Sequence, residues 1–239
     1  MRLATVIGVT CAMCFFAHAA LAHAGGVHFT LAGENQPSIE RTLNLLQRKV
    51  EEEGETDEIF CLLAEAHFYY GDWFSGEEQI QIWRQGEQYA RRALELNSHS
   101  ADAHYWVAAT LGKMGRAQGI LKSLFLVNPM FEHLGAALEI DSEHSWAHYA
   151  LSHLYLELPP KPLGRGDRTL ALSYAGRAFE LEPEEPEFVL QYARLLLKEN
   201  HVEEARSLLL AALDDPTVRW TEPLFGEAGR LARLPGDEN

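Results

Sequence analysis

Three histidines that lie close together in the second half of the sequence are the first candidates for chemistry. His144 and His148 are four residues apart, which places both on one face of a helix and can hold a divalent metal; His153 follows five residues later. A metal-dependent hydrolase using this pair is therefore one hypothesis. No Asp, Glu or Cys completes a recognised motif around the pair, so we predict no metal site.

The remaining reactive side chains do not assemble into a catalytic motif. The sequence lacks a G-x-S-x-G elbow, a phosphate-binding P-loop, an H-E-x-x-H motif and a Cys/His ligand set. Cys61 lies in an apolar stretch, which favours a small buried side chain over a reactive thiol. The acidic runs 51–55 and 182–187 are typical of solvated helix ends. We therefore predict a protein that is not an enzyme and has no cofactor.

The charge balance excludes nucleic acid as an expected partner. The 239 residues include 35 acidic and 20 basic side chains, a formal charge of −15, whereas binding to a phosphate backbone requires a basic surface. With 47% hydrophobic residues the chain can bury a core. We expect an ordinary globular protein.

The N-terminal residues 1–24 predict a signal peptide. Arg2 is followed by an apolar run that ends in two overlapping small-x-small sites, Ala20-Leu21-Ala22 and Ala22-His23-Ala24. Cleavage there predicts a periplasmic or secreted protein with a single cysteine, Cys61. An uncleaved membrane anchor is the alternative, because about 20 apolar residues can span a bilayer.

The rest of the chain contains an internal repeat. A short segment occurs as Ala93-Leu94-Glu95-Leu96, Ala137-Leu138-Glu139-Ile140 and Ala178-Phe179-Glu180-Leu181, with a weaker copy at Ala212-Leu213. Each copy precedes a short polar step and a new run with apolar residues at helical spacing. Nothing comparable predicts strands, so the fold class is all-α, built from antiparallel helix pairs.

This spacing resembles the tetratricopeptide repeat (TPR), a helix-turn-helix of 34 residues in which small residues let neighbouring helices approach. The resemblance implies an α-solenoid of TPR-like hairpins. The expected repeats are residues 57–100, 101–144, 145–185 and 186–219, with a capping helix in 25–56 and a second capping helix and tail in 220–239.

The first two repeats are longer than the standard unit. Residues 77–96 are continuously helix-compatible, so we expect elongated second helices, with Pro129 interrupting the apolar stretch 119–127. This segment contains too many large apolar residues for one stripe and must be covered on most sides. It is therefore either a buried helix against the inner face or the wall of an apolar ligand cleft.

The long second repeat, with Gly115-Arg116-Ala117-Gln118-Gly119, and the later run Pro162-Leu163-Gly164-Arg165-Gly166-Asp167 resemble one TPR subfamily. It includes the periplasmic T component of TRAP-type transporters (TatT) and, more distantly, the eukaryotic regulators of microtubule dynamics. The resemblance implies a concave surface or pore that contacts a solute-binding protein and holds an apolar ligand. TatT proteins are typically lipid-anchored, and neither Cys11 nor Cys14 follows the tripeptide that precedes a lipid anchor.

Two sets of residues are candidates for binding. His104 and His148 occupy the same site of successive repeats, which favours packing or peptide contact and makes a groove bordered by Tyr105 and Tyr149. The apolar cleft would have an aromatic floor from the neighbouring helices. The candidates are His104, Tyr105, Trp106, His148, Tyr149, Leu121, Leu124, Phe125, Phe131 and Trp83, with Met130 as a further wall residue.

The predicted function is an interaction module that binds a partner protein or peptide. Its most specific form is a transporter-associated accessory protein that contacts a solute-binding protein. The alternative is a carrier of an apolar small molecule in a cavity lined by residues 119–131. The sequence leaves the formation of a homo-oligomer open.

Overall fold

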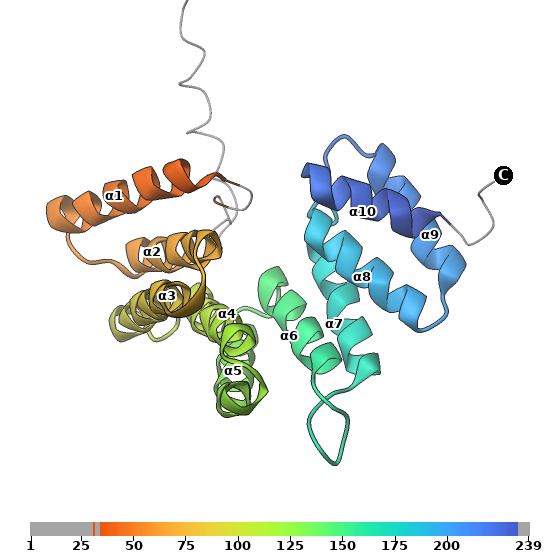
Figure 1. Cartoon of the computed structure of the whole chain (residues 1–239), viewed down its shortest axis with the longest axis horizontal. Coiled ribbons are helices and arrows are strands. Elements are labelled where there is room, and N and C mark those ends of the chain that lie inside the picture. Colours follow the sequence, from red (N-terminus) through yellow and green to blue (C-terminus); the bar gives the residue numbers. More distant parts are fainter. Residues whose placement is uncertain (1–30, 32–33, 234–239) are drawn as a thin grey trace, which may run out of the picture.

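The computed structural model describes residue 31 and residues 34–233, apart from the side chains of residues 120–122. Within this part the chain forms helices and no strands, which confirms the all-α prediction (Figure 1). The elements are α1 (Gln36–Glu53), α2 (Asp57–Tyr70), η1 (Gly71–Trp73), α3 (Gly76–Leu96), α4 (Ala101–Gln118), α5 (Ile120–Ile140), α6 (Ser145–Glu157), α7 (Arg168–Leu181), α8 (Pro186–Lys198), α9 (Val202–Asp214) and α10 (Glu222–Ala232). The predicted signal peptide, residues 1–24, lies outside the described residues.

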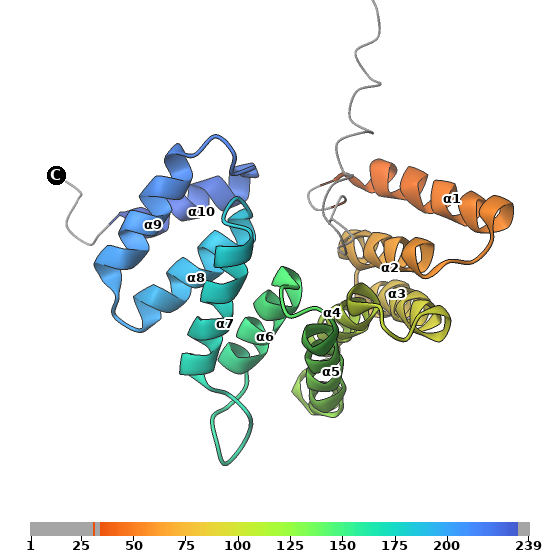
Figure 2. The same cartoon turned by 180° about the vertical axis from the view of Figure 1, so that it is seen from behind.

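Consecutive helices pack in antiparallel pairs. The pairs are α2 with α3, α4 with α5, α6 with α7 and α8 with α9, and the second helix of one pair contacts the first helix of the next. Figures 1 and 2 show that these pairs follow a curve, with α1 at one end and α10 at the other. We call α2, α4, α6 and α8 the first helices and α3, α5, α7 and α9 the second helices.

One buried alanine lies near the end of each second helix. Three of the four side chains are completely buried and the fourth is nearly so, as expected where small side chains let neighbouring helices pack; the alanines are Ala93, Ala137, Ala178 and Ala212. In α3, α5 and α7, the residue that follows the helix donates its backbone N–H to the carbonyl of the buried alanine. These donors are Asn97, Asp141 and Glu182. The recurring alanines therefore have equivalent surroundings.

Each first helix begins with a side chain that caps its N-terminus. The capping side chain accepts a hydrogen bond from a backbone N–H two or three residues later, which satisfies one of the donors that a helix start leaves unpaired. The caps are Thr56, Ser100, His144 and Glu185. These caps fix where each repeat begins.

The expectation that Pro129 interrupts the apolar segment is wrong. Helix α5 continues through Pro129, which lies in its interior. Leu134 is buried in the core, and Leu126 and Met130 pack against that core on either side of the proline. These contacts with the array hold the helix together although proline removes one backbone hydrogen bond.

Among residues 31 and 34–233, no helix combines the length and the apolar character that crossing a membrane requires.

Candidate functional site

The first helices bring buried and partly buried tyrosines and carboxylates within electrostatic range of one another. Tyr69 comes from α2, Tyr105 from α4 and Tyr149 from α6, and burial is the largest cause that raises the pKa of each hydroxyl. Each also senses the charge of Glu187 on α8, while Glu65 on α2 acts on Tyr69 and Tyr105. We call these five residues the inner cluster. Four different helices can contribute to it because the array curves.

Glu187 connects the last repeat to the rest of the inner cluster. It lies in the first turn of α8, where the helix dipole favours a negative charge. Its carboxylate is hydrogen-bonded to the Tyr149 hydroxyl, which raises the pKa of that hydroxyl further. The charge of Arg194, also on α8, acts in the opposite direction on Tyr149.

Glu65 is completely buried, and a residue far away in the sequence binds it. The backbone N–H of Leu31 donates a hydrogen bond to Glu65 Oε1 at 3.1 Å. A buried carboxylate is costly unless donors surround it, so this contact contributes to the stability of the site. The side chain of Leu31 is buried as well and belongs to the main hydrophobic core.

Aromatic rings hold the tyrosines of the inner cluster in place. The Tyr149 ring lies 5.5 Å from Trp146, 5.2 Å from Phe188 and 4.6 Å from His153, measured between ring centroids. Tyr105 packs edge-on against Trp106 at 5.0 Å. Such contacts add about 0.5–1.5 kcal/mol each beyond burial. The site is therefore largely preformed, with little side-chain entropy left to lose on binding.

His144 and His148 do not build a metal site. Nδ1 of His144 accepts the N–H of Ala147, so Nε2 carries the proton and donates it to Asp102 Oδ1 at 3.2 Å. His148 Nε2 lies 3.0 Å from the carbonyl oxygen of Ser142. The described residues hold no group of three or more potential ligands around this pair or elsewhere. His144 instead links the cap of α6 to α4.

His104 and His148 each turn toward the second helix of their own pair. His104 Nδ1 lies 2.9 Å from Nδ1 of His133 on α5, and the His148 ring lies 5.6 Å from that of Tyr174 on α7. The two histidines therefore occupy equivalent positions, as the repeat pattern predicted. Their rings pack within their own helix pair, whereas the neighbouring Tyr105 and Tyr149 belong to the inner cluster.

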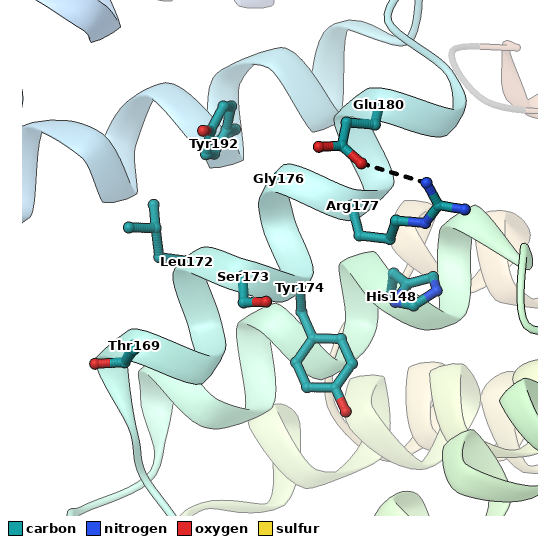
Figure 3. Close-up of a pocket in the computed structure, with 9 residues that line it drawn as sticks. All are labelled: His148, Thr169, Leu172, Ser173, Tyr174, Gly176, Arg177, Glu180 and Tyr192. Carbon is teal, nitrogen blue, oxygen red and sulfur yellow. Dashed lines mark hydrogen bonds and ion pairs between the residues drawn. The ribbon is translucent and has the colours of Figure 1, made fainter.

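His148 also borders a shallow hollow of about 560 Å³ centred on α7. Figure 3 shows the residues that line it: His148, Thr169, Leu172, Ser173, Tyr174, Gly176, Arg177, Glu180 and Tyr192. Arg177 pairs with Glu180 at 3.3 Å and with Glu143 at the same distance, and these side chains are largely exposed. Paired, solvated charges leave little for a ligand to bind, so we do not assign a function to this hollow.

The expectation that the apolar insert is covered on most sides is wrong. Phe125 is 83% exposed and Leu124 is 57% exposed, so these two side chains neither fill the inner face nor enclose a cavity. Helix α5 packs on α4 with its other face, and nothing among the described residues covers the outer one. The side chain of Leu121 lies outside the described residues.

The other aromatic candidates have structural positions. Trp106 is completely buried, and Trp83 is buried with its ring N–H donating to the carbonyl of Phe68 at 3.1 Å. Phe131 packs edge-on against Tyr155 at 5.1 Å and lies beneath the Arg165 guanidinium. Trp83 and Trp106 are therefore core residues instead of the floor of a ligand cleft.

Sequence reasoning missed three members of the inner cluster, Glu65, Tyr69 and Glu187. Glu187 was included in an acidic run interpreted as a solvated helix end. Its neighbour Glu185 shows that this run is partly buried, because burial raises the pKa of the Glu185 carboxyl to about 7. The position of Glu187 within its repeat could have identified it. Pro186 begins α8, so Glu187 is the second residue of its helix, as Asp102 is in α4.

Comparison with known proteins identifies two matching regions. The sequence profile of "Regulator of microtubule dynamics protein 1-3" matches residues 30–158, and a tetratricopeptide repeat profile matches residues 163–218. Regulator of microtubule dynamics protein 1 of Bos taurus is 26% identical over 184 residues, which cover 69% of this chain and 57% of the bovine protein. The match thus spans little more than half of that relative.

Solved structures of TPR proteins have a similar fold. A thermophilic TPR protein of Thermus thermophilus superimposes with a TM-score of 0.65 at 16% identity, covering 83% of this chain and 92% of that one. YrrB, described as a TPR protein with an unusual peptide-binding site, has a TM-score of 0.44 at 16% identity, with 81% and 84% covered. The first of these likenesses, together with the repeat profile, confirms the α-solenoid.

Proposed function

Because the chain belongs to the family of regulator of microtubule dynamics proteins 1-3, whose profile matches more than half of it, we propose that its TPR solenoid binds a partner protein through the inner cluster. The observation that carries this proposal is the inner cluster itself, to which four helices from all four helix pairs contribute. A solenoid of this kind uses its concave surface for extended binding partners.

The chemistry of the inner cluster suits binding better than catalysis. Its tyrosines have raised pKa values and remain neutral, so they provide aromatic area and hydrogen-bonding hydroxyls. Tyrosine is enriched where proteins bind one another for the same reason. The carboxylates favour a partner segment that brings hydrogen-bond donors and no negative charge.

The resemblance to the TatT proteins supports a more specific form of this proposal. In that form the signal peptide directs export and is then cleaved, and the mature protein assists a transporter by contacting a solute-binding protein. The regulation of microtubule dynamics named for the bovine relative is not part of the proposal, because the match spans 57% of that protein. The apolar carrier is not pursued, since Leu124 and Phe125 are exposed.

The proposal is tested by comparing matched variants in affinity capture. The wild-type chain is immobilised beside Glu187→Lys, which reverses one charge of the inner cluster, and Phe125→Ser, which changes an exposed residue elsewhere. We expect one partner, identified by mass spectrometry and then purified, to bind wild type and Phe125→Ser equally and Glu187→Lys at least about tenfold more weakly. Equal binding to all three folded proteins would show that the inner cluster is not the binding surface.

A further inference from the structure

We propose that Leu31 occupies the binding site of the inner cluster as an intramolecular ligand, and that Glu65 binds the backbone amide of aliphatic segments there. This inference rests on the proposed function, and it names the class of peptide that the site accepts. It also means that a partner segment must take the place of Leu31.

Glu65 contacts the main chain of Leu31 and not its side chain. The donor at 3.1 Å is a main-chain N–H, so the interaction does not depend on which side chain the bound segment carries. Glu65 lies on α2 and is completely buried, where a hydrogen bond is stronger than in water. An acceptor oxygen in this position can therefore bind a segment through its backbone amide whatever side chain that residue carries.

The buried side chain of Leu31 favours an aliphatic residue at this position. Leu31 is only 7% exposed, and its side chain belongs to the same hydrophobic core as residues of α2, α4 and α6. Burying a leucine side chain contributes about 1.5–3 kcal/mol. The backbone amide and the side chain of one residue are thus bound together, which is how a peptide-binding site combines affinity with specificity.

Leu31 is tethered to the array by the short segment that leads into α1. The carbonyl of Leu31 accepts the N–H of Glu34 at 3.2 Å, and Asn35 caps the start of α1 by accepting the N–H of Ser38. Leu31 is therefore only a few residues from a helix that is packed on α2. A short tether gives an effective concentration on the order of millimolar, so a free peptide competes poorly with Leu31.

The carboxylates around the site disfavour an acidic occupant. Glu65 and Glu187 belong to the inner cluster, and Asp102 acts on Tyr105 as well. An acidic segment would be repelled here. We therefore expect the occupant to be a peptide with a leucine-like side chain and no acidic residue next to it.

The test uses a separate synthetic peptide with the sequence around Leu31 as the probe. The probe is a fluorescein-labelled peptide of residues 27–35, VHFTLAGEN, and its binding is followed by fluorescence anisotropy. The protein is the full chain, either wild type or Leu31→Pro, which removes both the side chain and the amide donor of the intramolecular ligand. We expect Leu31→Pro to bind the probe at least about tenfold more tightly than wild type, because its site is free.

A matched peptide isolates the backbone contact. The same probe with N-methyl-leucine at the position of Leu31 keeps the side chain and loses the N–H, and we expect it to bind Leu31→Pro about tenfold more weakly. Leu31→Gly repeats the measurement if Leu31→Pro does not fold, as judged by circular dichroism. Equal binding of the two peptides, or no gain in either variant over wild type, would overturn the inference.

Failure of this inference is distinguishable from failure of the proposed function. If the probe does not bind but capture of the partner still depends on Glu187, the intramolecular ligand alone is rejected. If the probe binds as expected and capture does not depend on Glu187, the inner cluster binds this peptide but is not the surface used for the captured partner.

Discussion

His104 and His133 face each other between α4 and α5 with their Nδ1 atoms 2.9 Å apart. At this distance one Nδ1 is protonated and donates a hydrogen bond to the other, unprotonated Nδ1. The pair is therefore formed by neutral rings. Burial, together with the charges of His104 and Arg91, lowers the pKa of His133 to about 4. Burial likewise lowers the pKa of His104.

This pair predicts a loss of stability in acid. Because the folded pKa of His133 lies below that of an unfolded histidine, the unfolded chain binds more protons as the pH falls from about 7 to 4, and the free energy of unfolding falls with it. We expect the half-buried His133 to account for about 1–2 kcal/mol of that loss. Urea denaturation at pH 7 and pH 4.5 should therefore show a smaller decrease for His133→Gln. His201→Gln, which removes an exposed histidine, should keep the wild-type decrease.

Glu185 predicts the opposite dependence at higher pH. Burial raises the pKa of this capping carboxyl to about 7, above its unfolded value, so its contribution to stability is present below the unfolded pKa and is lost as the pH rises through 7. Glu185→Gln keeps an oxygen that can cap α8 but has no charge to bury. In urea denaturation at pH 8, we expect the free energy of unfolding of Glu185→Gln to exceed that of wild type by about 1–2 kcal/mol. The exposed Glu184→Gln should show no such gain. Equal stability of wild type and Glu185→Gln at pH 8 would contradict this.

The buried alanines predict an asymmetry within α5. Ala137 is completely buried, so Ala137→Leu forces the helices apart and should lower the free energy of unfolding by about 1–3 kcal/mol. Gly135 lies two residues earlier, and a methyl group added there meets open space. Gly135→Ala should therefore raise stability by about 0.5–1 kcal/mol through helix propensity. Thermal denaturation of both variants measures the difference; a harmless Ala137→Leu would show that the helices are not in close contact.

The exposed position of Phe125 predicts that this residue is dispensable for folding. Phe125→Ser should change the free energy of unfolding by less than about 0.5 kcal/mol, because the side chain has little contact to lose. It should also lower the tendency of the protein to aggregate, measured by light scattering, since an exposed phenylalanine is removed. A loss of several kcal/mol would mean that the outer face of α5 is covered in solution.

The repeats were predictable from the sequence because their signal is local. The alanines of the second helices recur with the same neighbours, and each marks a close approach that only a small side chain allows. The inner cluster was not predictable in the same way. Glu65 and Tyr69 both lie on α2, whereas Glu187 lies on α8, about 120 residues later, and its charge reaches Tyr69 only because the array curves. That curvature depends on small rotations between neighbouring pairs, which no local pattern encodes.

For the apolar insert, residues 119–127, the sequence predicted burial that the structure does not show. A run with Leu124, Phe125 and Leu126 suggests burial on all sides, yet within the described part of the chain α5 packs mainly on α4, with fewer contacts to α6, and leaves Leu124 and Phe125 in solvent. Apolar content alone does not say which faces of a helix find partners.

Hydrogen exchange at the backbone amide of Leu31 tests most directly the central claim, that the inner cluster binds a backbone amide through Glu65. In the full wild-type chain, exchange followed by mass spectrometry or NMR should be slowed at least about 100-fold relative to an unstructured peptide, because the N–H is buried and hydrogen-bonded. Exchange at the rate of an unstructured peptide would contradict the account.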